Sequence, residues 1–308
     1  MDLVSLISPT YNCAECLPYF LDSIINQTYD RIQLVIVDDG STDNTGSVLD
    51  SYIGRFHSRG YEMIVLHQPN LGQAAAINHA LGHFSGDFLM WIDSDDMIEP
   101  ECITEMVEWL KQNPDKDFVL CDARHVNYPD FSTKYLFSRK LDGKKDPYFY
   151  DILKGTHNYT LGNGSLLVRS ERFRSTHPQM KIYESRQGQN YQLILPLVYF
   201  CSWGYIHKPF YIRVQRPDSH FYMKRSYEEE LTRQSDCAVL MKETIRMMHI
   251  PDEKKAFQLI ENRFAHRSFE LAFDKGDNAE MKKQLKILFL NRGLTLNEIV
   301  QFLRKSSK

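Results

Sequence analysis

Residues 33–43 read QLVIVDDGSTD, an apolar segment followed directly by acidic and small polar residues. Residues 33–37 form a nearly continuous apolar run, which is typical of a parallel strand covered on both faces. Two aspartates, a glycine and small polar residues follow at once, and such residues favour turns. The stretch therefore predicts a buried strand that ends in an acidic loop.

Similar strand signals recur along the first half of the chain and alternate with helical patterns. The expected strands are 3–7, 33–37, 63–66, 88–92 and 118–120, and the expected helices are 17–25, from about 45, 74–81 and 103–110. The helices carry apolar residues at the i, i+3, i+4 and i+7 spacing of a buried face. This alternation predicts an α/β fold with a mostly parallel central sheet and helices on both faces.

The second half of the chain is less regular and ends in helices only. Between about 125 and 220 we expect a strand at 165–168, a helix at 189–200 and a strand at 211–214. From about 222 the patterns are helical, with breaks at 276–277 and 291–293. We therefore predict a main domain at 1–220 and a C-terminal helical extension at 221–308.

Charge is spread unevenly over these two regions. Residues 1–220 carry 20 basic and 27 acidic residues, a net charge of −7, whereas residues 221–308 carry 17 and 13, a net charge of +4. We interpret the basic region as a solvated helical surface, with a membrane- or phosphate-facing patch as the alternative. The overall net charge of −3 is too small to indicate a nucleic acid partner.

The sequence shows no signal for export or membrane insertion. Its start lacks the basic residues and the long apolar run of a signal peptide. No apolar stretch reaches the roughly 18 residues that a transmembrane helix needs. We therefore expect a cytoplasmic protein, with peripheral contact at the inner face of a membrane as a hypothesis.

The six cysteines are scattered, and we expect reduced thiols, as is usual inside cells. Cys13 and Cys16 form a CxxC pair, but the sequence has no second pair at the spacing of a zinc site. A redox motif would need a thioredoxin-like context. We interpret the pair as two small residues that open a helix, with redox activity as the alternative.

Polar residues gather where three predicted strands end. They read SPTYN at 8–12, DDGSTD at 38–43 and DSDD at 93–96. The carboxyl ends of parallel strands meet at one edge of a sheet, where ligands bind. Several carboxylates at one edge repel one another unless a cation or hydrogen-bond donors compensate them. The pattern predicts Mn²⁺ or Mg²⁺ at Asp93 and Asp95, where the ion would neutralise a diphosphate leaving group.

Four motifs in this order give the chain a resemblance to a known family. They are PTYN at 9–12, VDDGSTD at 37–43, NLG at 70–72 before an alanine-rich helix, and DSDD at 93–96 with Pro100. The chain resembles glycosyltransferase family 2 of the bacterial cell-surface polysaccharide type, closely over about the first 110 residues and loosely to about 220. The resemblance implies the GT-A fold, with a nucleotide-binding half at 1–110 and an acceptor-binding half at 111–220.

The resemblance also implies an activity and its partners. A sugar would pass from a nucleotide diphosphate donor, commonly a UDP-sugar, to a hydroxyl of a saccharide or a lipid-linked glycan. A base would take the hydroxyl proton, and the oxygen would attack the anomeric carbon with inversion. For the C-terminal helices, internal packing is the simplest interpretation, and membrane contact and a homodimer are hypotheses.

Individual residues take roles by the same resemblance. Donor-binding residues would be Pro9, Thr10, Tyr11, Asp38, Asp39, Asn70, Gly72, Asp93, Ser94 and Arg216, and metal ligands would be Asp93, Asp95 and His220. Thr10 and Tyr11 would line the base pocket, and Asp39 would accept a hydrogen bond from the base. Asp95 would be the main metal ligand. As an alternative, Asp38 is a turn residue that caps the following helix.

One position departs from the family pattern. Members usually carry Gly-Glu-Asp at a helix start after the acceptor loop, with a carboxylate as general base, but this chain has Gly188, Gln189 and Asn190. An amide cannot accept a proton near neutral pH, so Gln189 and Asn190 would bind substrate hydroxyls instead. We predict Glu184 as the catalytic base, with a salt bridge to Arg186 as the alternative. A retaining route also stays open.

Other classes of protein also place aspartates at strand ends. A haloacid-dehalogenase-like phosphoryl-transfer enzyme would need threonine or valine after its DxD motif, whereas Asp96 and Met97 follow here. A receiver domain would be much shorter than 308 residues. A non-catalytic glycosyltransferase-like module that binds nucleotide sugars stays open because of the departure at 189–190.

Overall fold

The computed structural model describes residues 2–137, 148–156, 164–186, 188–216 and 225–306. The chain divides into two compact units. The first comprises Met1–Lys144 and Leu161–Tyr222, and the second comprises Lys145–Thr160 and Met223–Lys308. Each unit is described by itself below.

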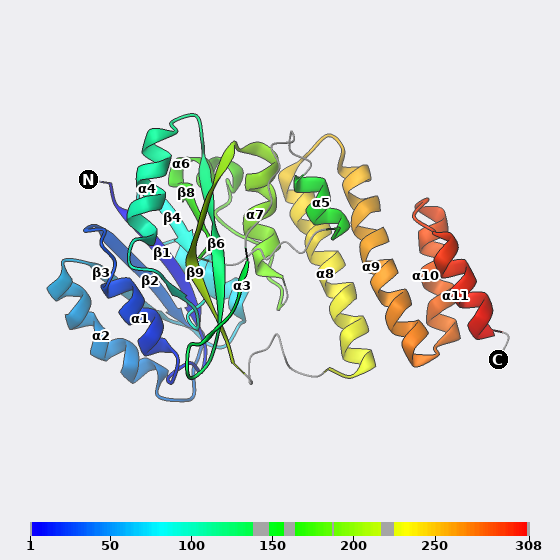
Figure 1. Cartoon of the computed structure of the whole chain (residues 1–308), viewed down its shortest axis with the longest axis horizontal. Coiled ribbons are helices and arrows are strands. Elements are labelled where there is room, and N and C mark those ends of the chain that lie inside the picture. Colours follow the sequence, from blue (N-terminus) through cyan, green and yellow to red (C-terminus); the bar gives the residue numbers. More distant parts are fainter. Residues whose placement is uncertain (1, 138–147, 157–163, 187, 217–224, 307–308) are drawn as a thin grey trace. The chain divides into compact units, whose positions relative to one another are not determined.

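The first unit is built on one nine-stranded sheet (Figure 1). Its strands are β1 (Val4–Thr10), β2 (Ile32–Asp38), β3 (Glu62–His67), β4 (Phe88–Trp91), β5 (Met97–Ile98), β6 (Phe118–Asn127), β7 (Thr133–Phe137), β8 (Leu166–Arg169) and β9 (Trp203–Gln215). They lie in the order β3-β2-β1-β4-β8-β6-β9-β5, and β7 pairs with β6.

The half of the sheet formed by β3, β2, β1 and β4 is parallel, as predicted. Thr10 at the end of β1 lies opposite Asp38 at the end of β2, and Asp38 lies opposite His67. The loops that follow these strands therefore leave the sheet at one edge. This register places the predicted polar strand ends beside one another.

The other half of the sheet differs from the prediction of a continued parallel run. The strand expected at 118–120 does not lie beside β4, because β8 pairs antiparallel with both β4 and β6 and separates them. It is also longer than expected, since β6 continues to Asn127 and pairs parallel with β9. Antiparallel strands need no helical crossover, so the βα alternation in the sequence could not reveal this insertion.

Helices cover both faces of the sheet, as predicted. They are α1 (Leu17–Ile25), α2 (Thr45–Arg59), α3 (Gln73–Leu81), α4 (Cys102–Gln112), α6 (Ser170–Thr176) and α7 (Gln189–Phe200). The apolar sides of α1, α2 and α4 join Leu6, Leu34 and Met90 in one buried cluster. α3 packs against β1 and β2 and lies with α7 on the other side (Figure 1).

The loop between β1 and α1 is fastened to the loop between β2 and α2. Asn12 accepts a hydrogen bond from the Thr42 amide at 2.8 Å. Asp43 accepts from the amides of Ala14 and Thr45 at 3.1 and 2.9 Å. Burial opposes ionisation of Asp43, but a hydrogen bond from the Thr45 hydroxyl and these two amide hydrogen bonds outweigh it and lower the pKa of the carboxyl group. The two loops thus form one fixed wall at the edge of the sheet.

A disulfide joins Cys13 and Cys16 in the turn before α1. The Leu17 amide donates to the Cys13 carbonyl oxygen at 2.8 Å, and the turn brings the two cysteine Cα atoms to 5.4 Å, a distance that suits a disulfide. The expectation of six reduced thiols is therefore wrong for this pair, because the turn that opens the helix folds one cysteine onto the other. The remaining cysteines, Cys102, Cys121, Cys201 and Cys237, are free.

The second unit is helical. Its helices are α5 (Tyr148–Lys154), α8 (Tyr227–Met248), α9 (Glu253–Lys275), α10 (Asn278–Leu290) and α11 (Leu296–Ser306). The breaks predicted at 276–277 and 291–293 are confirmed. Ser226 and Glu229 form a reciprocal capping box that starts α8. α5 packs on α9, where Arg263 donates to the Ile152 carbonyl oxygen at 2.7 Å. In the described part of the chain, we find no helix with the length and apolarity needed to cross a membrane.

A thiol titration tests the disulfide. In the denatured, non-reduced chain we expect four reactive thiols, and six after reduction, because Cys13 and Cys16 are bonded to each other. The double variant Cys13→Ser/Cys16→Ser is the matched control and should give four thiols under both conditions. Six thiols in the wild-type chain before reduction would contradict the disulfide.

Candidate active site

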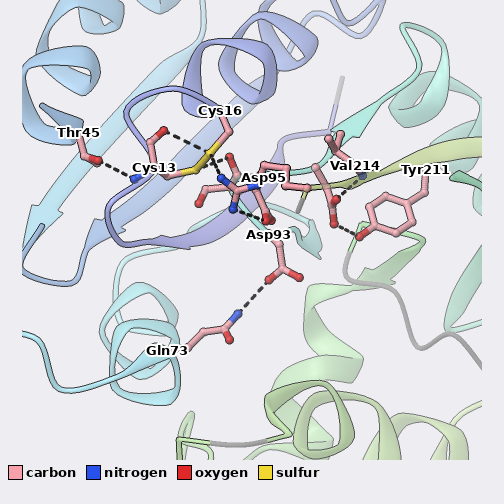
Figure 2. Close-up of polar contacts among 11 residues, drawn as sticks. Cys13, Cys16, Thr45, Gln73, Asp93, Asp95, Tyr211 and Val214 are labelled. Carbon is pink, nitrogen blue, oxygen red and sulfur yellow. Dashed lines mark hydrogen bonds and ion pairs between the residues drawn. A yellow bond between two sulfur atoms is a disulfide. The ribbon is translucent and has the colours of Figure 1, made fainter. Parts of the chain in front are cut away.

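An acidic cluster follows β4 at the edge where the parallel strands end. Asp93, Asp95 and Asp96 each offer a carboxylate oxygen, and these atoms lie within 4.8 Å of one another. Figure 2 shows Asp93 and Asp95 beside the turn that holds the disulfide. Each carboxylate has a different partner, and the partner determines whether the carboxylate can bind a metal ion or has a structural role.

Asp93 is held by the first residue of α3. The Gln73 side-chain amide donates to Asp93 Oδ1 at 2.9 Å (Figure 2). Gly72 precedes the helix with φ = +96°, a conformation that favours glycine. This backbone conformation directs the chain into α3 and brings Gln73 to the cluster. The sequence pattern does not single out Gln73, although this residue lies directly after the motif at 70–72.

Asp95 is paired with Arg216, which follows the end of β9. Arg216 Nη2 lies 3.0 Å from Asp95 Oδ2, and both side chains are partly buried. Arg216 Nη1 also lies 3.3 Å from Cys16 Sγ. The predicted donor-binding residue Arg216 therefore lies at the acidic cluster, where its positive charge compensates the carboxylates.

Asp96 has a structural role that the sequence did not reveal. It is buried and accepts hydrogen bonds from the Tyr211 hydroxyl and, at 2.8 Å, from the Val214 amide. Burial raises the pKa of Asp96 well above its ordinary value, and the nearby charges of Asp95 and Asp93 add to the shift. Asp96 thus fastens the end of β9 to the acidic loop. This attachment fixes the position from which Arg216 reaches Asp95.

Asp39 fastens the loop that carries Asn70 and Gly72. It accepts hydrogen bonds from the amides of Leu71 and Gly72 at 3.0 and 2.9 Å, and from the Gln68 side chain at 2.8 Å. A carboxylate offers about four acceptor positions, so about one is left for a hydrogen bond from a nucleotide base. The predicted base-binding role of Asp39 stays a prediction.

Asp38 ends β2 and Gly40 lies in the loop after it, which contacts the loop that carries Asn70. A Cβ on Gly40 would lie 2.7 Å from the Asn70 amide nitrogen, and its φ is +74°. Glycine at this position therefore allows the loops after β2 and β3 to touch. Asp38 accepts from the Ser41 amide at 3.0 Å and lies 3.3 Å from His67 Nδ1. It stabilises the turn, while Asn44, not Asp38, precedes α2.

The predicted base pocket lies at the end of β1. Thr10 is buried, and its hydroxyl has no hydrogen-bond partner among the described residues. Pro9 is partly buried, and the ring of Tyr11 is exposed. Ser94 is buried, and its carbonyl oxygen faces Cys13 Sγ at 3.6 Å. An unpartnered buried hydroxyl beside an exposed aromatic ring suits a ligand that both stacks and forms hydrogen bonds.

The predicted base Glu184 lies on a segment that α3 holds in place. Asn78 on α3 exchanges hydrogen bonds with the Ile182 backbone at 2.8 and 3.0 Å, and its side-chain amide lies 3.5 Å from Glu184 Oε1. Glu184 is exposed and forms no ion pair with Arg186. A Cβ on Gly72 would lie 3.7 Å from Arg186 Cγ, so this segment borders the loop that carries Asn70 and Gly72. The sequence pattern did not predict that Arg186 lies beside Gly72.

Gln189 and Asn190 open α7, after Gly188 with φ = +65°. Gln189 is buried. The Asn190 Oδ1 atom is buried and has no hydrogen-bond partner among the described residues, so it can accept a hydrogen bond from a ligand hydroxyl. The predicted metal ligand His220 lies outside the described residues, and its role stays a prediction.

Comparisons with known proteins show which family the chain matches. The sequence model of Glycosyl transferase family 2 matches residues 5–212, which is more than half of the chain. The putative glycosyltransferase EpsE of Bacillus subtilis is 25% identical over 248 residues, 80% of this chain and 84% of EpsE. Glycosyltransferase GlyG of Streptococcus pneumoniae is 32% identical over 137 residues, 44% of this chain and 43% of GlyG. The chain thus aligns with less than half the length of GlyG.

Solved structures share the fold. TarS 1–349 of S. aureus, in complex with UDP-GlcNAc, matches with a TM-score of 0.64 at 18% identity, covering 93% of this chain and 79% of that one. Mannosyltransferase PcManGT from Pyrobaculum calidifontis, in complex with GDP-Man and Mn²⁺, matches with a TM-score of 0.55 at 18% identity, covering 99% and 80%. The predicted GT-A fold is confirmed.

The family match runs through the strand ends that build the site, from Thr10 at the end of β1 to Tyr211 on β9. The motifs and the matching region therefore agree, and the expected enzyme class, a glycosyltransferase, is confirmed. The chain belongs to glycosyltransferase family 2.

Proposed function

We propose that this glycosyltransferase moves a sugar from a UDP-sugar to a hydroxyl of a saccharide or lipid-linked glycan, with a divalent metal ion and with inversion. The observation that supports this most directly is the pair Asp93 and Asp95, whose oxygens can approach one ion at the end of β4. The relatives in complex with UDP-GlcNAc, or with GDP-Man and Mn²⁺, support a nucleotide-sugar donor and a metal.

The residues at the acidic cluster fit a hard divalent ion. Asp93 and Asp95 are partly exposed carboxylates, the ligands that Mn²⁺ and Mg²⁺ prefer. Asp96 is a poor ligand, because the Tyr211 hydroxyl and the Val214 amide already occupy its two oxygens. When bound, the ion would supply positive charge against the diphosphate leaving group. Arg216, the present partner of Asp95, would add a second positive charge beside the same group.

Glu184 is the base in this proposal. Its carboxylate is exposed and has no ion pair with Arg186, so it can accept a proton from a substrate hydroxyl. In the proposed step Glu184 takes the proton of the acceptor hydroxyl while the oxygen bonds to the anomeric carbon. The bond from that carbon to the diphosphate breaks with the electron pair on the leaving group. Asn190 Oδ1 would accept a hydrogen bond from a substrate hydroxyl and orient the sugar.

The proposed location follows from the acceptor. A lipid-linked glycan would be presented at a membrane surface, so we place the enzyme in the cytoplasm, peripheral at the inner face of the membrane. A homodimer through the C-terminal helices is a further hypothesis. A donor panel in the presence of Mn²⁺ tests the whole proposal, because hydrolysis or transfer from one nucleotide sugar supports the enzyme. Tight binding without turnover would support the non-catalytic module.

The substitution Asp95→Asn tests the metal site. It removes one negative ligand, so we expect Mn²⁺-dependent UDP binding, measured by calorimetry, to weaken at least tenfold, or about 1.4 kcal/mol. The matched control is Asp50→Asn, which changes an exposed aspartate on α2 and should bind as the wild type does. Melting curves confirm that both variants fold. Unchanged binding in folded Asp95→Asn would remove Asp95 from the proposed metal site.

The substitution Glu184→Gln tests the base. Loss of a general base lowers turnover by roughly 100-fold or more, and donor binding should stay unchanged because Glu184 acts on the acceptor. Glu171→Gln, at an exposed position on α6, is the matched control. Asn190→Ala should mainly raise KM through lost positioning. Full turnover in Glu184→Gln would show that another group takes the proton.

A further inference from the structure

Helix α11 exposes an apolar stripe. Leu296, Ile299, Val300 and Leu303 follow the i, i+3, i+4 and i+7 spacing that places side chains on one side of a helix. Such a stripe normally packs against a core, but these four side chains are 36% to 81% exposed. The stripe therefore leaves much of its apolar surface uncovered by the described residues.

The opposite side of α11 already packs within the second unit. Glu298 is buried, and its carboxylate accepts hydrogen bonds from the Thr295 amide at 2.9 Å and from the Thr295 hydroxyl at 2.9 Å. Phe302 packs against the cluster formed by Phe269, Ala272 and Met281. The exposed stripe is thus a second apolar side, which the fold of this unit does not use.

The end of α10 exposes two further large apolar side chains. Phe289 and Leu290 are 70% and 67% exposed, and they lie at the C-terminal end of the helix that packs beside α11 (Figure 1). We name these six residues the terminal apolar face: Phe289, Leu290, Leu296, Ile299, Val300 and Leu303. Large apolar side chains concentrated in this way mark an interaction surface more often than singly scattered ones do.

Positive charge accompanies the terminal apolar face. Residues 281–308 contain seven lysines and arginines but one acidic residue, Glu298, which is buried. Lys282 and Lys286 are exposed on α10. Lys286 and Phe289 follow Lys282 by four and seven residues, a spacing that places all three on the same side of the helix. Neither forms an ion pair within the described part of the chain, whereas Lys283 pairs with Glu280 at 3.0 Å.

We propose that the terminal apolar face docks onto an anionic lipid bilayer. An amphipathic helix places its apolar side chains at the boundary of headgroups and acyl chains, and neighbouring lysines bind the negative surface. A second copy of this chain fits less well, because the same face would bring two strongly positive segments together. This inference rests on α10 and α11 alone and does not depend on the proposed sugar transfer.

Vesicle sedimentation of the full chain tests the proposal. We expect binding to phosphatidylcholine vesicles that contain phosphatidylglycerol, weaker binding at high salt, and little binding to phosphatidylcholine alone. The double variants Leu296→Ser/Leu303→Ser and Lys282→Glu/Lys286→Glu should each lower the partition coefficient at least tenfold. Melting curves show whether each variant is folded.

The matched controls change residues of the same kinds elsewhere in the second unit. Val239→Ser/Met247→Ser removes exposed apolar side chains from α8, and Lys254→Glu reverses an exposed charge on α9. Both controls should sediment with vesicles as the wild type does. The proposal is overturned if the wild type does not bind anionic vesicles, or if the folded leucine variants bind them as the wild type does. It is also overturned if the wild type is a dimer that these leucine changes dissociate without any effect on vesicles.

Discussion

The carboxylates after β4 lie close together and repel one another. Residues from several elements of the first unit compensate this repulsion. Arg216 compensates Asp95, Gln73 donates to Asp93, and burial with two hydrogen bonds accommodates Asp96. The compensating groups come from β9, α3 and the segment after β9, which the sheet brings to one edge. A cluster that needs several remote donors cannot form until those elements have packed, so the site is a product of the whole fold.

The sequence predicted the fold where local pattern and topology agree. The continuous apolar run before Asp38 predicted a buried parallel strand, and β2 is one. The helix expected at 189–200 has the observed bounds of α7. The sequence did not predict the strand order where strands distant in the chain pair, as β8 does between β4 and β6. It also did not reveal β5 and β7, because these short strands carry too little periodicity. Periodicity identifies a strand but not its neighbour.

For the candidate site, too, the sequence predicted part of the arrangement and missed the rest. Strand-end motifs located Asp39, Asp93 and Asp95, because the end of a strand fixes where the next side chains lie. The partners of these residues were not predictable, since Gln73 and Tyr211 lie on elements whose approach depends on packing. The sequence also could not separate Asp96 from Asp95, as only the structure shows that Asp96 holds β9. Reduced thiols at Cys13 and Cys16 are the wrong expectation, because the CxxC spacing does not show that the turn before α1 brings the two residues together.

Helix α3 touches both sides of the site: Gln73 at its first residue holds Asp93, and Asn78, five residues later, holds the segment of Glu184. The groups proposed for donor and acceptor are therefore not separate modules that can be exchanged independently. A chimera that imports residues 182–190 from a relative would also need that relative's counterpart of α3, or the imported loop would lose its anchor. If the proposed roles hold, a change of acceptor preference would require compensating changes in α3 beside Asp93.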